Sequence, residues 1–186
     1  MKGSGHPAVY KTMIKITKFG GSSVANAEQF RKVKHIIESD DARRFVVVSA
    51  AGKADKEDNK ITDLLYLCHA HVEYHVDYHG IFDIIRQRFL DIKNELGLSI
   101  RIEKELDELC ERLPKLSVDE LVSRGEYFTS RMMADYLRFP FVDAADVVKI
   151  NYDGSIDFDA TDENLRFIMK DHDRFVLPGF YGSTPD

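Results

Sequence analysis

TMIKITKFGGSSVAN, residues 12–26, is the stretch that decides the fold of this chain. Apolar and polar residues alternate over 13–18, which predicts a short β-strand ending in a lysine. Two glycines and two serines follow, and a helical pattern begins after them. Because glycine lacks a Cβ atom, Gly20 and Gly21 can adopt positive φ and let backbone N–H groups approach an anion. This order of elements favours a phosphate-holding turn, to which Lys18 adds a positive charge.

The same stretch also fits an ordinary turn between a strand and a helix, with an exposed lysine. It is neither a G-x-x-x-x-G-K-[ST] loop nor a G-x-G-x-x-G fingerprint, the glycine patterns typical of nucleotide sites. The pair of glycines by itself therefore leaves both interpretations open.

The segments that follow predict a βαβ unit. Residues 26–39 carry an apolar stripe at helical spacing, with Asn26 as the helix N-cap. The run FVVV at 45–48 has no polar face, which is typical of a strand buried on both sides of a parallel sheet. Further strands are expected at 141–144, 147–150 and 174–178. The pattern predicts an α/β fold, a three-layer α/β/α sandwich with a mostly parallel sheet.

A helical insertion is predicted over residues 66–116. Two apolar stripes at helical spacing end near Gly97 and Pro114, and they predict an antiparallel hairpin of helices beside the sheet.

Three histidines in the first part of this insertion have the spacing of one helical face: His71, His75 and His79. Histidines one turn apart can chelate a metal ion. No carboxylate or cysteine of obvious role joins them, so we prefer a solvated histidine face and assign no metal site.

A long helix is predicted to begin at Ser117, which opens a capping box. Gly125 lies inside it, where glycine costs roughly 1 kcal/mol relative to alanine, so we expect a close neighbour at its backbone. Glu126 lies at the margin of the apolar stripe and has two interpretations. It is either a solvated surface carboxylate or a carboxylate that receives a substrate ammonium.

A later helix over 162–170 is predicted to be capped by Thr161.

Two small-residue loops are expected to meet in space. The segment SAAGK at 49–53 follows the buried strand, as the glycine pair follows the first strand. Ligands of open α/β sheets bind outside the carboxyl ends of the strands, where such loops lie. Parallel strands therefore place both loops at one edge, as a candidate site.

Composition excludes several classes of function. The formal charge of −6 argues against a nucleic-acid partner, and no apolar run approaches the ~20 residues of a membrane span. Cys68 and Cys110 lack metal-ligand spacing and fit a reducing cytoplasm, so we expect a cytoplasmic protein. Residues 1–12 contain no signal-peptide core and are interpreted as a tag or a disordered lead-in.

Four motifs, taken together, resemble the aspartate kinases of the amino acid kinase family, whose fold is of the carbamate kinase-like type. They are KFGGSSV at 18–24, SAAGK at 49–53 with ITDLL at 61–65, SRGEYFTSRMMADYL at 123–137 and PGFYGS at 178–183. The resemblance implies transfer of the γ-phosphoryl group of ATP, bound with Mg²⁺, to the side-chain carboxylate of L-aspartate. This reaction begins the biosynthesis of lysine, threonine and methionine.

The resemblance also implies roles for individual residues. Lys18 is the implied catalytic lysine that bridges the transferred phosphoryl group. The implied contacts to the phosphates of ATP are Lys18, Phe19, Gly20, Gly21 and Ser22. The implied contacts to aspartate are Ser49, Thr62, Glu126, Gly179 and Phe180, with Glu126 on the α-ammonium. A carboxylate nucleophile is ionised at neutral pH, so the chemistry requires no general base.

The family's pattern continues beyond PGFYGS into a motif that this sequence does not contain. We therefore expect residues 13–186 to be the N-terminal part of a catalytic domain, without the C-terminal ATP-binding half and the ACT domains. Such a fragment is expected to be inactive alone, and the full-length protein to be a homo-oligomer. The alternatives are a non-catalytic assembly module, or a family member with another acceptor, such as glutamate, N-acetylglutamate or carbamate. Glu126 disfavours the N-acetylated acceptor.

Overall fold

A parallel sheet forms the centre of the computed structural model, which describes residues 13–185. Its strands are β1 (Lys15–Phe19), β2 (Arg43–Val48) and β5 (Phe175–Pro178), in the order β1-β2-β5. The first two predicted strands and the last are thereby confirmed. The expectation for residues 1–12 lies outside the described residues.

The predicted βαβ unit is present. A short 3-10 turn, η1 (Gly21–Val24), leads from β1 into α1 (Ala27–Glu38), which returns the chain to β2. The side chain of Asn26 accepts a hydrogen bond from the N–H of Gln29 at 3.0 Å and caps α1, as predicted.

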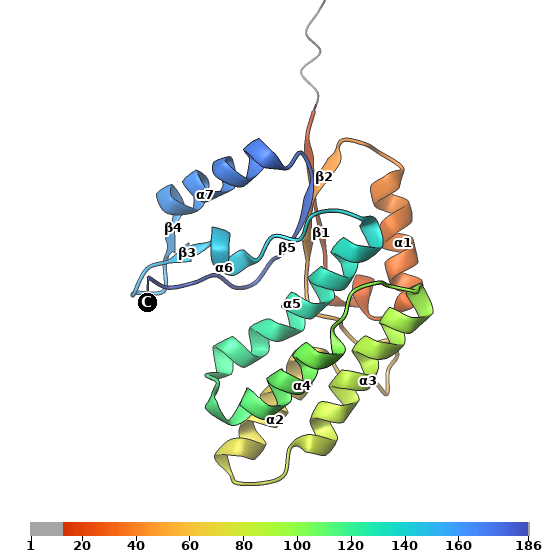
Figure 1. Ribbon diagram of the computed structural model, residues 1–186, viewed down its shortest axis with the longest axis vertical. Helices are drawn as coiled ribbons and strands as arrows, with labels where there is room; N and C mark the ends of the chain where they lie inside the picture. Colours follow the sequence, from red (N-terminus) through yellow and green to blue (C-terminus); the bar gives the residue numbers. More distant parts are fainter. Residues whose placement is uncertain (1–12, 186) are drawn as a thin grey trace, which may run out of the picture.

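The two faces of β2 pack into different layers, which confirms the predicted sandwich. Val46 and Val48 are fully buried in the main core, together with apolar side chains of α1. Phe45 belongs to a second apolar cluster, which includes side chains of α6 (Ala144–Val147) and α7 (Phe158–Asp171). Figure 1 shows α1 on one side of the sheet and α7 on the other.

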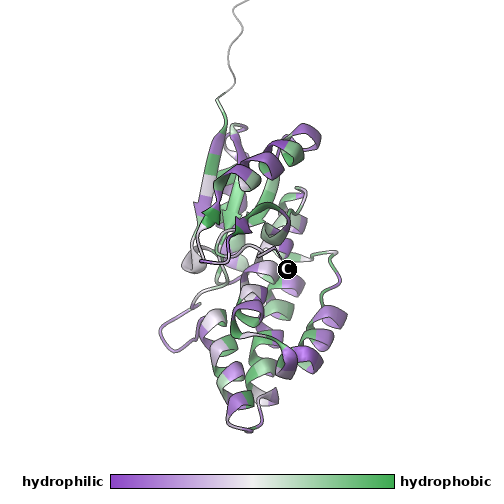
Figure 2. Cartoon of the chain, turned by 90° about the vertical axis from the view of Figure 1, so that its left-hand side faces the viewer, coloured by the Kyte–Doolittle hydropathy of each residue, from purple (hydrophilic) through white to green (hydrophobic). Residues whose placement is uncertain are grey.

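The predicted helical insertion lies between β2 and the long helix α5 (Val118–Leu137). Its elements are α2 (Ile61–Glu73), α3 (His79–Leu96), α4 (Glu103–Arg112) and the turn η2 (Leu113–Lys115). They pack beside α5 at one end of the molecule (Figure 1), and the ring centroids of Phe89 and Phe128 lie 5.6 Å apart. Figure 2 shows hydrophobic residues on the strands and on one side of these helices.

Gly125 has the close neighbours that we predicted. A Cβ atom there would lie 3.2 Å from side-chain atoms of Ala50, Ile61 and Leu65. The glycine therefore lets α5 approach both α2 and the loop after β2. The cap of α5 is also as predicted, since Ser117 accepts a hydrogen bond from the N–H of Glu120.

The predicted strand at 141–144 is wrong. Phe141 forms one isolated bridge with Val176, and α6 begins at Ala144. The reason is local: the side chain of Asp143 accepts a hydrogen bond from the N–H of Ala145 and caps a helix instead of continuing the sheet.

The predicted strand at 147–150 is reduced to β3 (Lys149–Ile150), which pairs antiparallel with β4 (Ile156–Asp157). Thr161 does not cap the following helix. Asp157 caps α7, and the Thr161 hydroxyl accepts a hydrogen bond from the N–H of Lys149.

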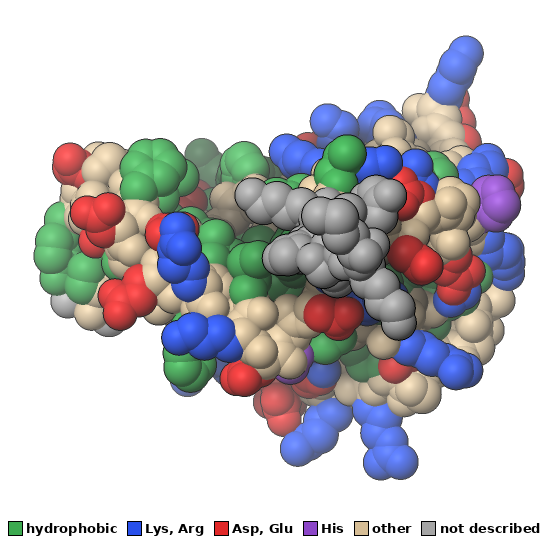
Figure 3. Space-filling model, turned by 90° about the horizontal axis from the view of Figure 1, so that it is seen from above, with side chains coloured by type: hydrophobic (Ala, Val, Ile, Leu, Met, Phe, Trp, Pro, Cys, Tyr) green, Lys and Arg blue, Asp and Glu red, His purple; other side chains and the backbone are tan. Residues whose placement is uncertain are grey.

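No residue of α7 is buried, and Phe158 and Phe167 are exposed. Viewed from above, hydrophobic side chains gather at the α7 end of the molecule with acidic side chains among them (Figure 3). Few buried contacts hold this helix, so we expect it to belong to the less stable part of the fold.

The loops after β1 and β2 pack backbone against backbone. The N–H of Gly52 donates to the carbonyl of Gly21 at 2.9 Å, and a Cβ atom on Gly21 would lie 2.8 Å from the Ala50 carbonyl oxygen. The predicted use of positive φ is wrong for both glycines of the pair, since Gly20 has φ of −76° and the glycines with positive φ in the described part are Gly97 and Gly154. Close approach of two backbones is what requires Gly21.

We expect Gly21→Ala to lower the free energy of unfolding by about 1–3 kcal/mol, because the added methyl group overlaps backbone atoms that cannot rotate away. Gly20→Ala is the matched control, since a Cβ atom there meets nothing within 4 Å. It should change stability by less than about 0.5 kcal/mol. Urea unfolding measures both, and equal effects would contradict the contact.

Candidate functional site

A pocket of about 590 Å³ lies where the loops after β1, β2 and β5 meet α2 and α5. This is the carboxyl edge of the parallel strands, as the sequence predicted. Six of the predicted site residues line it: Gly21, Ser22, Ser49, Thr62, Glu126 and Phe180.

Glu126 is buried, with 6% of its surface exposed, so its interpretation as a solvated surface carboxylate is wrong. Its Oε2 accepts a hydrogen bond from the N–H of Gly179 at 3.1 Å. The backbone N–H groups of Phe180 and Ala50 also lower the pKa of this carboxylate by hydrogen bonding. Segments from the loops after β2 and β5 therefore converge on one side chain of α5.

Burial raises the pKa of Glu126 above its ordinary value. The N–H groups of Phe180, Gly179 and Ala50, and the positive charge of Lys18, oppose this shift without cancelling it. Within residues 13–185, no ion pair joins Glu126 to a cation. The pocket thus contains a carboxylate that an added cation would stabilise.

Lys18 lies at the end of β1, in register with Val47 of β2, and its side chain is exposed. Its Cε atom would be 3.9 Å from a Cβ atom built on Gly179. Gly179 is the residue that donates to Glu126, so Lys18 and Glu126 both lie next to Gly179. Lys18 does not line the pocket itself and lies beside it.

The other predicted phosphate contacts differ in exposure. Ser22 and Gly20 are exposed at the mouth of the first loop. The side chain of Phe19 is buried in the core, so it cannot contact a phosphate. Its backbone carbonyl accepts a hydrogen bond from the N–H of Ser49 at 3.1 Å and joins the two loops.

The loop after β5 depends on a glycine and a tyrosine. A Cβ atom on Gly179 would lie 2.5 Å from Cγ1 of Val47, so no larger residue fits there without movement. The Tyr181 hydroxyl donates to Oδ1 of Asp143 at 2.8 Å, and the Arg124 guanidinium lies 5.6 Å from the centroid of the Tyr181 ring. These contacts hold Phe180 at the rim of the pocket.

Sequence reasoning placed Lys53 in a candidate-site loop but missed several other lining residues: Lys60, Tyr66, Val122 and Ser123. Helical spacing could have identified two of them. Tyr66 lies one turn after Thr62, and Ser123 lies one turn before Glu126, so each shares a helix face with a predicted site residue.

The three histidines do not share a helical face. His71 is in the last turn of α2, His75 lies after that helix with φ of 56°, and His79 begins α3. Among the described residues, no group of three histidine, cysteine or acidic side chains is arranged to hold a metal ion. None of the helices in residues 13–185 combines the length and the apolar content that crossing a bilayer requires.

Comparison with known proteins identifies relatives over most of the chain. Residues 13–186 match the amino acid kinase family. Aspartokinase 3 of Bacillus subtilis is 34% identical over 189 residues, which cover 93% of this chain and 41% of that protein. The chain therefore spans well under half of that relative.

Two solved structures share the fold. The aspartate kinase of Clostridium acetobutylicum superposes with a TM-score of 0.89 at 40% identity, over 93% of this chain and 40% of that one. Aspartokinase III of E. coli, in complex with aspartate and ADP, has a TM-score of 0.77 at 24% identity over 92% of this chain and 42% of that one.

The raised pKa of Glu126 predicts a pH-dependent stability. The folded protein favours the protonated form of Glu126, and this form contributes to the free energy of unfolding. The contribution is complete below about pH 4, near the pKa of glutamate in the unfolded chain, and it is lost as pH rises through the pKa of Glu126 in the folded protein. Glu126→Gln removes the buried charge. We expect the variant to unfold at higher urea concentration than the wild type at pH 7, and the difference to shrink toward pH 4. A difference that does not vary with pH would contradict this assignment.

Proposed function

The chain belongs to the amino acid kinase family, and from this premise we propose that it supplies the aspartate-binding part of an aspartate kinase. The reaction is ATP plus L-aspartate giving ADP plus 4-phospho-L-aspartate, the first step toward lysine, threonine and methionine. The similarity to aspartokinases of two bacteria supports the proposal. On the same premise, residues 13–186 are the N-terminal part of the catalytic domain, and the full-length protein is a cytoplasmic homo-oligomer.

One observation carries the proposal: the carboxylate of Glu126 is buried in the pocket, and no cationic side chain of residues 13–185 forms an ion pair with it. An α-ammonium group supplies the missing charge, and charge-assisted hydrogen bonds of this kind are strong and directional. The hydroxyl groups of Ser49 and Thr62 line the same pocket and are suited to donate to a carboxylate of the substrate.

The chemistry then follows from charge. The ionised side chain of L-aspartate attacks the γ-phosphorus of ATP, the bond from that phosphorus to the β–γ bridging oxygen breaks, and ADP leaves. No proton has to be removed from the nucleophile. In this proposal Lys18, near the end of β1, neutralises negative charge on the phosphoryl oxygens, and the backbone around Gly21 and Ser22 holds phosphate.

Mg²⁺ enters this proposal as an ion bound to the phosphates of ATP. The described residues contain no cluster of acidic, histidine or cysteine side chains suited to hold it, so no metal ligand is assigned to this chain. The ion would offset charge on the phosphates.

Titration calorimetry with the full-length gene product tests the acceptor. We expect L-aspartate to bind at least about tenfold more tightly than N-acetyl-L-aspartate, whose amide cannot pair with Glu126, since one lost charge-assisted bond is worth about 1.5–3 kcal/mol. Glu126→Gln should remove most of this preference. L-glutamate and carbamate are the competing acceptors, and tighter binding or faster phosphorylation of either would overturn the assignment to aspartate.

Lys18→Ala in the full-length gene product should lower kcat by about 10²–10³-fold and change the KM for aspartate by less than about threefold, because Lys18 is assigned to the transferred phosphoryl group. Lys15→Ala is the matched control on the same strand. Lys15 forms an exposed ion pair with Asp40 and should be dispensable. Steady-state kinetics measure both, and an unchanged kcat in Lys18→Ala would refute the catalytic role.

A further inference from the structure

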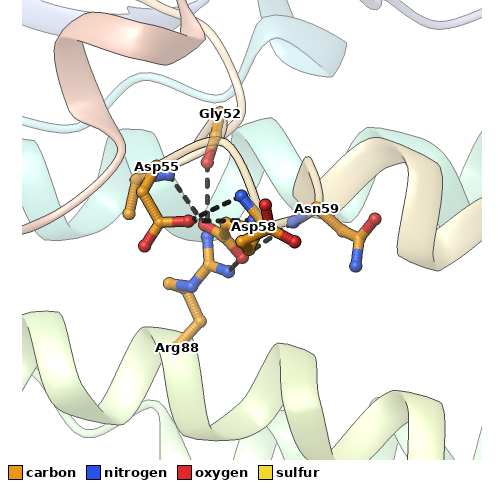
Figure 4. Close-up of polar contacts among 7 residues, drawn as sticks. Gly52, Asp55, Asp58, Asn59 and Arg88 are labelled. Carbon is orange, nitrogen blue, oxygen red and sulfur yellow. Dashed lines mark hydrogen bonds and ion pairs between the residues drawn. The ribbon is translucent and has the colours of Figure 1, made fainter.

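Arg88 extends from α3, in the helical insertion, to the loop between β2 and α2 (Figure 4). Its Nη1 donates to the carbonyl of Gly52 at 3.2 Å, and its Nη2 forms an ion pair with Oδ1 of Asp58. The Arg88 and Asp58 side chains are only 14% and 16% exposed, so solvent screens this pair less than a surface pair. The planar guanidinium holds two acceptors in fixed positions, which a lysine cannot do.

Asp58 organises residues 53–60, which we call the pocket loop. Its Oδ2 accepts from the N–H of Ala54 at 2.7 Å, and its Oδ1 accepts from the N–H of Asn59 at 2.8 Å. Burial raises the pKa of Asp58, but these two N–H groups and Arg88 outweigh burial, so the pKa lies below its ordinary value. Asp58 is therefore ionised at neutral pH and able to pair with Arg88.

The pocket loop forms one border of the pocket, because Lys53 and Lys60 at its two ends are lining residues. Both ends continue into site elements: Gly52 packs on Gly21, and Ile61 begins α2, which carries Thr62. Among the described residues, Arg88 is the one side chain outside the pocket loop that forms a hydrogen bond or ion pair with it.

We propose that Arg88 is a positioning residue, which ties the pocket loop to the helical insertion and so holds the border of the substrate pocket in its binding conformation. The insertion then does more than extend the core, because it determines how much of the pocket is preformed. Naming L-aspartate as the ligand rests on the proposed function, whereas the tie itself does not.

Limited trypsin digestion of the full-length gene product tests the tie without a ligand. Lys53, Lys56 and Lys60 are exposed trypsin sites within the pocket loop. In Arg88→Met we expect cleavage inside the loop to become about tenfold faster, because losing the tie should make the open form of the loop about tenfold more populated. Arg86→Met is the matched control, since Arg86 lies on the same helix and pairs with Asp107 and Asp83 instead. It should leave cleavage of the loop unchanged.

Calorimetry with L-aspartate tests the consequence for the site. The Kd for Arg88→Met should rise about tenfold, because binding must then order the loop, while kcat at saturating aspartate changes less than about threefold. Asp58→Asn should have the same two effects, and it tests the proposal should Arg88→Met fail to fold.

Each outcome decides between distinct claims. Unchanged loop cleavage in Arg88→Met would overturn the tie, and if that variant does not fold, unchanged cleavage in Asp58→Asn would overturn it. Faster cleavage with an unchanged Kd would overturn the positioning role and leave a purely structural contact. If the wild-type protein does not bind L-aspartate, the proposed function is wrong, and the cleavage rates still decide whether Arg88 holds the loop.

Discussion

The buried carboxylate of Glu126 is the constraint on which the other features of the site depend. A carboxylate shielded from water must be surrounded by donors or cations, and here backbone N–H groups of Gly179, Phe180 and Ala50 serve as donors. Those residues come from the loops after β5 and β2. The side chain thereby joins a helix to two sheet loops. No cation among residues 13–185 pairs with it, and the ammonium group of the proposed substrate would supply that charge.

The loops can reach Glu126 only because the backbone around them is closely packed. Gly21 and Gly52 lie against each other, Gly125 admits Ala50 to the side of α5, and Gly179 lies over the Val47 side chain. At each position a Cβ atom would meet another atom at 3.2 Å or less. Small residues thus determine the distances between the walls of the pocket, while the residues proposed to do chemistry are polar groups attached to those walls.

Local patterns predicted the elements whose causes are local. The cap at Asn26, the buried run at 45–48 and the insertion were all visible as periodicity or capping signals. The failures occurred where a short-range competitor was overlooked. Asp143 caps α6 where a strand was expected, and Asp157 caps α7 in place of Thr161. Helix α2 ends at Glu73, so the three histidines do not lie on one helix. In each case a side chain or a helix end redirected the backbone within a few residues.

The sequence by itself determined the fold class and the edge of the sheet where the site lies, because periodicity and the small-residue loops after strands are local properties of the chain. Most of the residues proposed to bind substrate came from the resemblance of its motifs to those of aspartate kinases. Tertiary structure alone decided that Glu126 is buried, that Gly21 serves close packing and not positive φ, and that Arg88 reaches the pocket loop. These three facts depend on contacts between segments far apart in the chain. No periodicity encodes such contacts, because they arise only when the layers are packed together.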